Sequence, residues 1–170
     1  MDKHLITVEE FKELARPVSV HIEEDDVRAF IRESEDTYII PALGYAVCKK
    51  LAEKERNELS NDEKVLLSGG EWTDCKGEVR YCNGLKKTVA YFAYARMARS
   101  DGSIIARAGY MRHGDEYSEH IESKERRNKE NDVMNMAEKY LSEAMAYWNS
   151  VTGKVKPVRG TRAVIKAIGD

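Results

Sequence analysis

Cysteine and proline are scarce in this sequence of 170 residues, with three of each. Three cysteines do not make a disulfide framework, and their number fits a reducing compartment. The apolar runs are short and no apolar core follows the basic N-terminal residues, so we expect neither a membrane-spanning segment nor a signal peptide. The formal net charge of −2 argues against a general nucleic-acid binder, which is normally basic overall.

Signatures of catalysis and metal binding are also missing. The chain has no Gly-rich phosphate loop, no HExxH motif and no nucleophile elbow. Four acids at Glu23–Asp26 resemble a metal cluster, but a calcium loop needs spaced ligands and a Gly, so we interpret them as a helix start. Cys75 and Cys82 form no CxxC and share no ligand spacing with the histidines, and we interpret them as plain thiols. The sequence therefore predicts a protein that is not an enzyme and has no cofactor or metal.

Charged residues, in contrast, are abundant at 34%, beside an apolar fraction of 42%. Such a composition is typical of a globular protein with long, exposed helical faces. The predicted fold class is all-α, mainly a bundle of about five to six helices with a small β-hairpin or loop insertion near 71–82. We expect a single domain over 1–150 and a basic C-terminal tail over 151–170.

The stretch that organises the chain is a helix over Leu85–Arg99. At 100° per residue Leu85, Val89 and Phe92 fall on one side, and Tyr91 and Tyr94 fall on the other. A helix that is apolar on nearly all sides is buried, with other elements around it. Two lysines in its first turn oppose the helix dipole, so this helix depends on packing more than on local propensity.

Local signals place several helix boundaries in the first half of the chain. Thr7–Glu10 and Ser60–Glu63 each have the pattern of a capping box, in which a hydroxyl and a carboxylate satisfy free N–H groups of the first turn. Pro17 ends the first helix. A second helix reaches Pro41, where the missing N–H predicts a kink or a restart with this proline in the first turn.

A hairpin or a long loop is predicted over Glu71–Cys82, with Lys76-Gly77 as a plausible turn. If these two residues form a two-residue turn, Cys75 lies opposite Glu78 and Cys82 lies opposite Glu71. The two cysteines then do not face each other.

In the second half of the chain, an extended segment or loop is predicted over Ser103–Gly114. A long helix is predicted to follow, from about Asp115 to Ser150. The first half of this helix, Glu119–Asp132, is almost wholly charged, and opposite charges four residues apart support an exposed helix. Its second half carries a broad apolar stripe. We therefore expect one end to pack on the core and the other to project.

The tail after Gly153 is basic. One acidic side chain and the terminal carboxylate oppose five basic residues in this tail. The basic residues are Lys154, Lys156, Arg159, Arg162 and Lys166. Two interpretations stay open, namely a mobile tail and an arm that becomes ordered on an acidic partner or on nucleic acid.

Three stretches of the chain, covering roughly Leu5–Asn149, resemble a known class of proteins. The first stretch is a short helix, a "DD" start and a second helix ending in PALG (residues 5–44). The second is a GGE hairpin feeding the Tyr- and Ala-rich helix (residues 66–100), and the third is the long closing helix (residues 115–149). Together they resemble the small helical type of head–tail connector, or neck adaptor, of tailed phages and prophages.

This resemblance implies a structural function. Such connectors self-associate into a ring that joins the portal protein to the tail or stopper proteins, first in the host cytoplasm during assembly and then in the virion neck. On this hypothesis Lys154, Lys156, Arg159, Arg162 and Lys166 contact the portal or packaged DNA, without any membrane contact. The alternative is a small helical nucleic-acid-binding or regulatory protein that uses the same tail.

Overall fold

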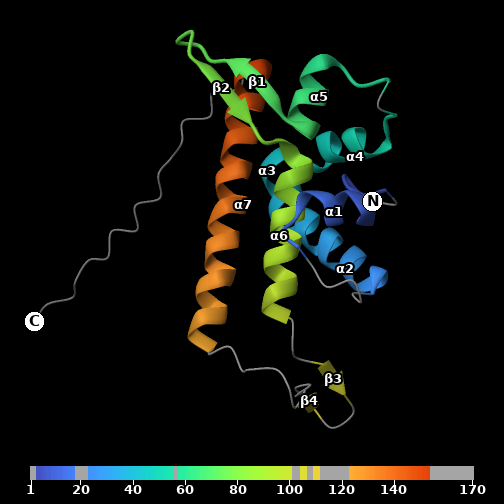
Figure 1. Cartoon of the computed structure of the whole chain (residues 1–170). Coiled ribbons are helices and arrows are strands. Elements are labelled where there is room, and N and C mark those ends of the chain that lie inside the picture. The colour runs from blue at the N-terminus through green and yellow to red at the C-terminus, as the bar shows by residue number, and fades with distance from the viewer. Residues whose placement is uncertain are drawn as a thin grey trace, which may run out of the picture.

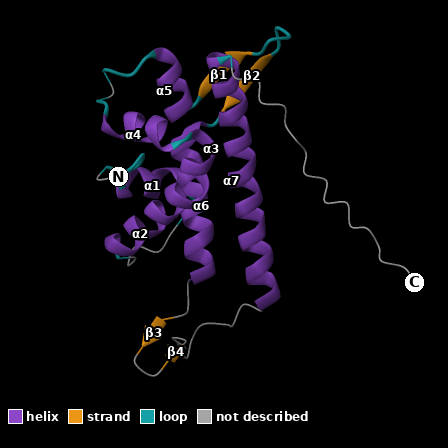
Figure 2. Ribbon diagram, turned by 180° about the vertical axis from the view of Figure 1, so that it is seen from behind, coloured by secondary structure: helices purple, strands orange, loops and turns teal. Residues whose placement is uncertain are grey.

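The computed structural model describes residues 3–17, 23–55, 57–100, 104–106, 109–111 and 123–153. The protein is mostly helical, and short antiparallel strand pairs are the other regular structure in the described ranges. Figures 1 and 2 show two long helices, α6 and α7, side by side, with the shorter helices α1 to α5 packed on one side of α6. The mainly helical class predicted from the sequence is therefore confirmed.

The first helix, α1, spans Val8–Leu14 and begins with the predicted capping box. The Thr7 hydroxyl accepts a hydrogen bond from the Glu10 N–H, and the Glu10 carboxylate accepts one from the Thr7 N–H. The helix ends before Pro17, as expected. The second helix, α2, spans Glu24–Ser34 and begins within the acidic run, where carboxylates favour the positive end of the helix dipole.

The chain changes its helical geometry between α2 and Pro41. A π-helical turn, η1, covers Glu35–Ile39, and α3 follows over Ile40–Leu43 with Pro41 in its first turn. The Ile40 N–H bonds to the Glu35 carbonyl, five residues back. A proline has no N–H and its ring clashes with the carbonyl four residues earlier, which accounts for the wider turn. Of the two alternatives that the sequence left open at Pro41, a kink or a restart, the structure has the restart with this proline in the first turn of α3.

Two short helices follow. Helix α4 spans Tyr45–Glu53, and α5 spans Asn61–Ser68. The second predicted capping box is present at the start of α5, where Ser60 and Glu63 bond to each other's backbone N–H groups. Helix α5 ends at Gly69, whose φ of +90° is a conformation that L side chains rarely adopt.

A β-hairpin follows α5, but its register differs from the predicted one. Strand β1 (Gly70–Thr73) pairs antiparallel with β2 (Val79–Cys82), so that Cys82 lies opposite Gly70 and not opposite Glu71. The assumed two-residue turn at Lys76-Gly77 was wrong. The Gly77 N–H bonds to the Asp74 carbonyl and the Asp74 N–H bonds to the Glu78 carbonyl, which gives a three-residue loop with Gly77 at φ +80°.

Helix α6 (Gly84–Ser100) is the centre of the fold and contacts α1, α2, α5 and α7. Leu85, Val89 and Phe92 have no exposed surface, and Tyr91 and Tyr94 on the other side are half-buried. The Phe92 ring stacks on Tyr38 with 4.1 Å between the ring centroids. The predicted central, buried helix is confirmed.

Helix α7 (Ser123–Thr152) runs antiparallel to α6 (Figure 1). Its second half packs on the core through a buried stripe: Val133, Ala137, Tyr140, Ala144 and Tyr147. Between α6 and α7, β3 (Ile104–Ala106) pairs antiparallel with β4 (Gly109–Met111), in agreement with the extended segment expected there. The predicted helix start near Asp115 lies outside the described residues, and the structure does not describe the side chains of the predicted charge pairs in the first half of this helix.

Candidate interaction surface

The basic residues singled out in the sequence lie beyond the described part of the chain. Lys154, Lys156, Arg159, Arg162 and Lys166 all follow Gly153, where the description ends. Helix α7 brings the chain to the hairpin end of the molecule before that point (Figure 2). The structure therefore places the start of the tail beside the hairpin, and it does not place the five basic side chains.

The hairpin is anchored to the core through one face. Trp72 of β1 packs edge-on against Tyr147 of α7, with 5.5 Å between the ring centroids and an interplanar angle of 68°. Cys82 at the end of β2 is fully buried. The Tyr147 hydroxyl donates to an Asp62 carboxylate oxygen at 3.2 Å, and burial, the larger cause, together with Asp62 raises the pKa of this phenol to about 12. These contacts fix the orientation of the hairpin relative to α7 and α5.

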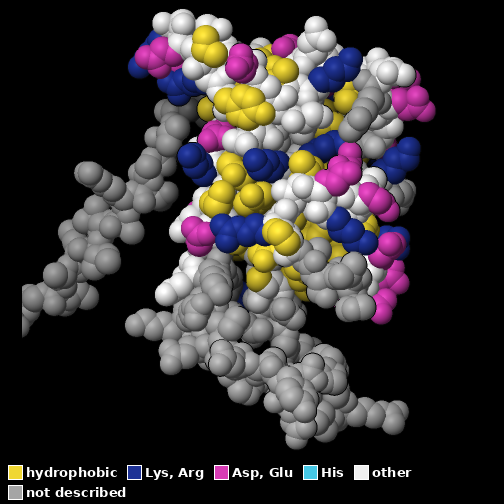
Figure 3. All heavy atoms as spheres, viewed as in Figure 1, with side chains coloured by type: hydrophobic (Ala, Val, Ile, Leu, Met, Phe, Trp, Pro, Cys, Tyr) yellow, Lys and Arg dark blue, Asp and Glu magenta, His cyan; other side chains and the backbone are white. Residues whose placement is uncertain are grey.

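The opposite face of the hairpin is open to solvent, and we call it the outer face. It consists of Glu71 and Thr73 from β1 and Val79 and Tyr81 from β2, because side chains alternate between the two faces of a strand pair. Val79 is 70% exposed and Tyr81 is 59% exposed, and both count among the large apolar side chains that the described residues expose. In Figure 3 apolar side chains reach the surface at this end of the molecule beside acidic and basic ones.

The tip of the hairpin is held by one carboxylate. One Asp74 carboxylate oxygen accepts the Lys76 and Glu78 N–H groups at 2.8 and 3.0 Å, and the other lies 2.7 Å from Arg80 Nε. These contacts, the Glu78 N–H first, lower the pKa of Asp74. A tip fixed in this way presents the outer face in one orientation.

A groove of about 360 Å³ adjoins Tyr81 between the hairpin, α1 and the start of α6. Lys86 lines it and pairs with Glu10. Lys87 lines it as well, with its ammonium 5.0 Å from the ring centroid of Tyr140 and 3.2 Å from an Asn83 oxygen. Within the described residues, the contacts of the Lys87 ammonium are therefore this amide oxygen and the neighbouring tyrosine rings.

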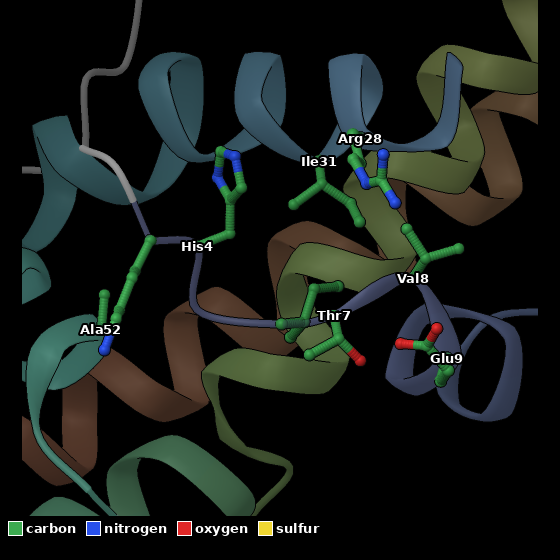
Figure 4. A pocket seen from close by; sticks show the side chains of 9 residues that line it. His4, Thr7, Val8, Glu9, Arg28, Ile31 and Ala52 are labelled. Carbon is green, nitrogen blue, oxygen red and sulfur yellow. The ribbon is translucent and has the colours of Figure 1, made fainter. Parts of the chain in front are cut away.

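A second cleft, of about 440 Å³, lies between the N-terminal segment, α1, α2 and α4 (Figure 4). Its walls include His4, Thr7, Arg28 and Ala52. The His4 ring points toward the helical segment above it, and its Nδ1 atom lies 2.8 Å from a Glu35 carboxylate oxygen. Arg28 is already engaged by Glu24 and Asp25 of its own helix, and the Thr7 hydroxyl is used as a helix cap.

The buried Glu35 and Cys48 side chains behind this cleft have a structural role. Glu35 is 1% exposed, and its burial raises the pKa of the carboxyl even though His4 and the Leu5 N–H stabilise the charge. Burial, assisted by the Glu35 charge, raises the pKa of the Cys48 thiol to about 11, so this cysteine stays protonated at neutral pH and is a poor nucleophile. Among the described residues no group of three His, Cys, Asp or Glu side chains has the placement to hold a metal ion.

Comparison with known protein families identifies one match. A family model described as a family of unknown function, DUF6712, matches residues 39–153, which is more than half of the chain. The chain belongs to this family. The DUF6712 match begins at the end of η1 and includes the hairpin, α6 and α7, whereas α1 and α2 precede it. No curated protein and no solved structure matches the chain.

The structure also contains features that the sequence did not reveal. The sequence predicted Tyr81 as an apolar strand residue but not its exposure. Tyr81 is exposed because of the hairpin register, which depends on the geometry of the loop. The partner of Glu35, His4, lies thirty-one residues away in the chain, and no local spacing predicts that contact. The cysteines are free thiols, with Cys48 and Cys82 buried and Cys75 exposed at the hairpin tip. No described helix is both long and apolar enough to cross a membrane.

Proposed function

We propose that this protein is a structural component of a tailed phage or prophage, a head–tail connector that joins the portal to the tail or stopper through a ring of subunits. Two observations support the proposal. The residue patterns over roughly Leu5–Asn149 resemble those of small helical neck adaptors, and the helical core presents a rigidly seated hairpin with an apolar outer face. We also propose that the helices form a single bundle of about five to six members.

The outer face of the hairpin is the observation that carries the proposal. An exposed apolar pair on a fixed scaffold is typical of a surface that docks on another protein, because such side chains gain free energy when water is removed from them. Val79 and Tyr81 lie two residues apart on one strand and therefore project from the same face. The anchoring of Trp72 on Tyr147 keeps this face in place before a partner binds.

In this proposal the tail and the hairpin have different partners. Lys154, Lys156, Arg159, Arg162 and Lys166 contact acidic groups of the portal or the phosphates of packaged DNA. The hairpin contacts protein, since its outer face is apolar with a single acidic side chain, Glu71. The hairpin lies at the end of the molecule at which α7 terminates (Figure 1).

The position of the gene tests this function. For a connector we expect portal, capsid and tail genes on either side of the gene, since structural genes of tailed phages cluster. A neighbourhood without phage genes would contradict the connector function.

The second candidate, a small nucleic-acid-binding or regulatory protein, is favoured by the five basic residues of the tail. Its signature would be an affinity for DNA that falls steeply with salt, because each phosphate contact releases counterions. Titration of DNA into the full-length chain at several salt concentrations distinguishes the two: a connector that contacts DNA only inside an assembled neck shows no measurable binding of the free chain.

A further inference from the structure

On one side of strand β2 the backbone N–H and C=O groups bond to no described residue. The Asp74 N–H bonds to the Glu78 carbonyl, and along an antiparallel pair the bonded and non-bonded residue pairs alternate. Val79 and Tyr81 therefore fall at non-bonded positions, where N–H and C=O groups point away from β1. No hydrogen bond joins these backbone groups to another described residue outside the hairpin.

The same two residues carry the exposed apolar side chains. Val79, Arg80 and Tyr81 are all exposed, so nothing in the described part of the chain covers this edge. An edge strand with free backbone groups and apolar side chains is a template for pairing with another strand.

We propose that β2 pairs antiparallel with β2 of a second copy of this chain, about a two-fold axis that passes beside Arg80. In this register Val79 lies opposite Tyr81 of the second copy, and Tyr81 lies opposite Val79 of the second copy. Both pairs fall where the backbone groups of β2 are free, so each pair can exchange both of its hydrogen bonds. The hairpins of the two copies then form one continuous sheet.

The side chains are self-complementary in this register. On the outer face each pair joins an aromatic ring to a β-branched side chain, a favourable cross-strand combination. On the inner face the two Arg80 side chains meet, but each one is already neutralised by Asp74 at 2.7 Å and by Glu78 at 3.3 Å of its own hairpin.

The antiparallel direction also matches the charges at the two ends of the hairpin. Glu78, which also pairs with Arg80 of its own hairpin, lies opposite Cys82 of the second copy, toward the end of the hairpin where α6 begins with Lys86 and Lys87. Within the described residues of one chain, the contacts of the Lys87 ammonium are the Asn83 oxygen and the neighbouring tyrosine rings. A carboxylate near the start of a helix is further stabilised by the helix dipole.

This pairing is independent of the connector function. A two-fold contact uses the same patch on both copies and closes on itself, so a ring of subunits needs other surfaces. Dimerisation of the free protein and assembly on a portal can therefore succeed or fail separately.

Sedimentation of the full chain over a concentration series tests the pairing. We expect the mass to rise from one copy toward two, and we expect the double substitution Val79→Lys/Tyr81→Lys to weaken dimerisation by about tenfold or more, since lysines on an edge strand oppose pairing. The control is Thr73→Lys, which places a single lysine on the same face but on the other strand, and we expect it to leave dimerisation unchanged. A chain that stays monomeric throughout the series overturns the proposal.

Cross-linking provides a second test that does not depend on a disruptive variant. Cys75 is exposed, so Cys75→Ser is made first. In this background Arg80→Cys places two thiols opposite each other at the two-fold axis, within reach of a disulfide, whereas Thr73→Cys does not. Oxidation should give covalent dimers with Arg80→Cys at several times the yield of Thr73→Cys. Equal yields, or dimers that persist in the lysine variant, overturn the proposal.

Discussion

The carboxylate of Glu35 holds the N-terminal segment against the π-helical turn that contains it. One of its oxygens lies 2.8 Å from His4 Nδ1, and the other accepts the Leu5 N–H at 2.6 Å. Leu5 and Ile6 are buried immediately after this contact. A wider turn before Pro41 and a distant N-terminal segment are thus joined by one buried acidic side chain.

Removal of the Glu35 carboxylate should destabilise the fold. Glu35→Ala leaves the buried Leu5 N–H without an acceptor, which costs about 1–3 kcal/mol. Glu35→Gln keeps a neutral acceptor of the same shape and should cost less. Urea unfolding at neutral pH measures both variants, and an alanine variant as stable as the parent would show that this contact does not hold the segment.

The raised pKa of Glu35 gives that comparison a pH dependence. The folded state binds the proton more tightly than the unfolded state, so this group adds stability below the ordinary carboxyl pKa of 4.5 and loses that contribution as pH rises through the raised folded value. The stability of the parent relative to Glu35→Gln should therefore fall over this window. A difference that is constant with pH would contradict the raised pKa of this buried carboxyl.

Glu63 should show the opposite dependence. Lys50, the largest cause, and the Ser60 N–H lower the pKa of this carboxyl to about 2. Its contribution is present above 4.5 and is lost as pH falls from 4.5 to about 2. Glu63→Gln should lower the free energy of unfolding by about 1 kcal/mol at pH 7, and the two proteins should converge near pH 2. Chemical unfolding at several pH values measures this, and Glu58→Gln on the neighbouring surface is the control.

Gly84 should tolerate no side chain. Its φ is +80°, and an added Cβ would lie 2.4 Å from the Gly69 backbone nitrogen. Gly77 has the same φ with open space around it, which makes Gly77→Ala a matched control. We expect Gly77→Ala to cost about 1–2 kcal/mol for the left-handed conformation alone, and Gly84→Ala to cost clearly more. Equal losses in thermal unfolding would contradict the close approach of the two backbone segments at this junction.

The sequence predicts the parts of this fold that local chemistry determines. The capping boxes at Thr7 and Ser60 need residues three positions apart, and the buried α6 follows from an apolar pattern on nearly all sides. The hairpin register assumed from the sequence was wrong. The actual register depends on the hydrogen bonds that the Asp74 backbone and carboxylate make with Lys76, Gly77 and Glu78. The contact of Glu35 with His4 joins distant segments and leaves no periodic signal. The basic charge of the tail can be read from the sequence. The exposure of the apolar side chains on the outer face of the hairpin cannot, because it depends on how the chain folds.

The most direct measurement of the connector function is assembly with the portal protein encoded in the same genome. The purified full-length chain and a variant that ends at Gly153 are mixed with portal rings, and electron microscopy and native mass measure what binds. We expect the full-length chain to add a ring of subunits to the portal and the truncated chain to keep its helical fold without adding to the portal. A full-length chain that does not bind the portal at any concentration would contradict the account.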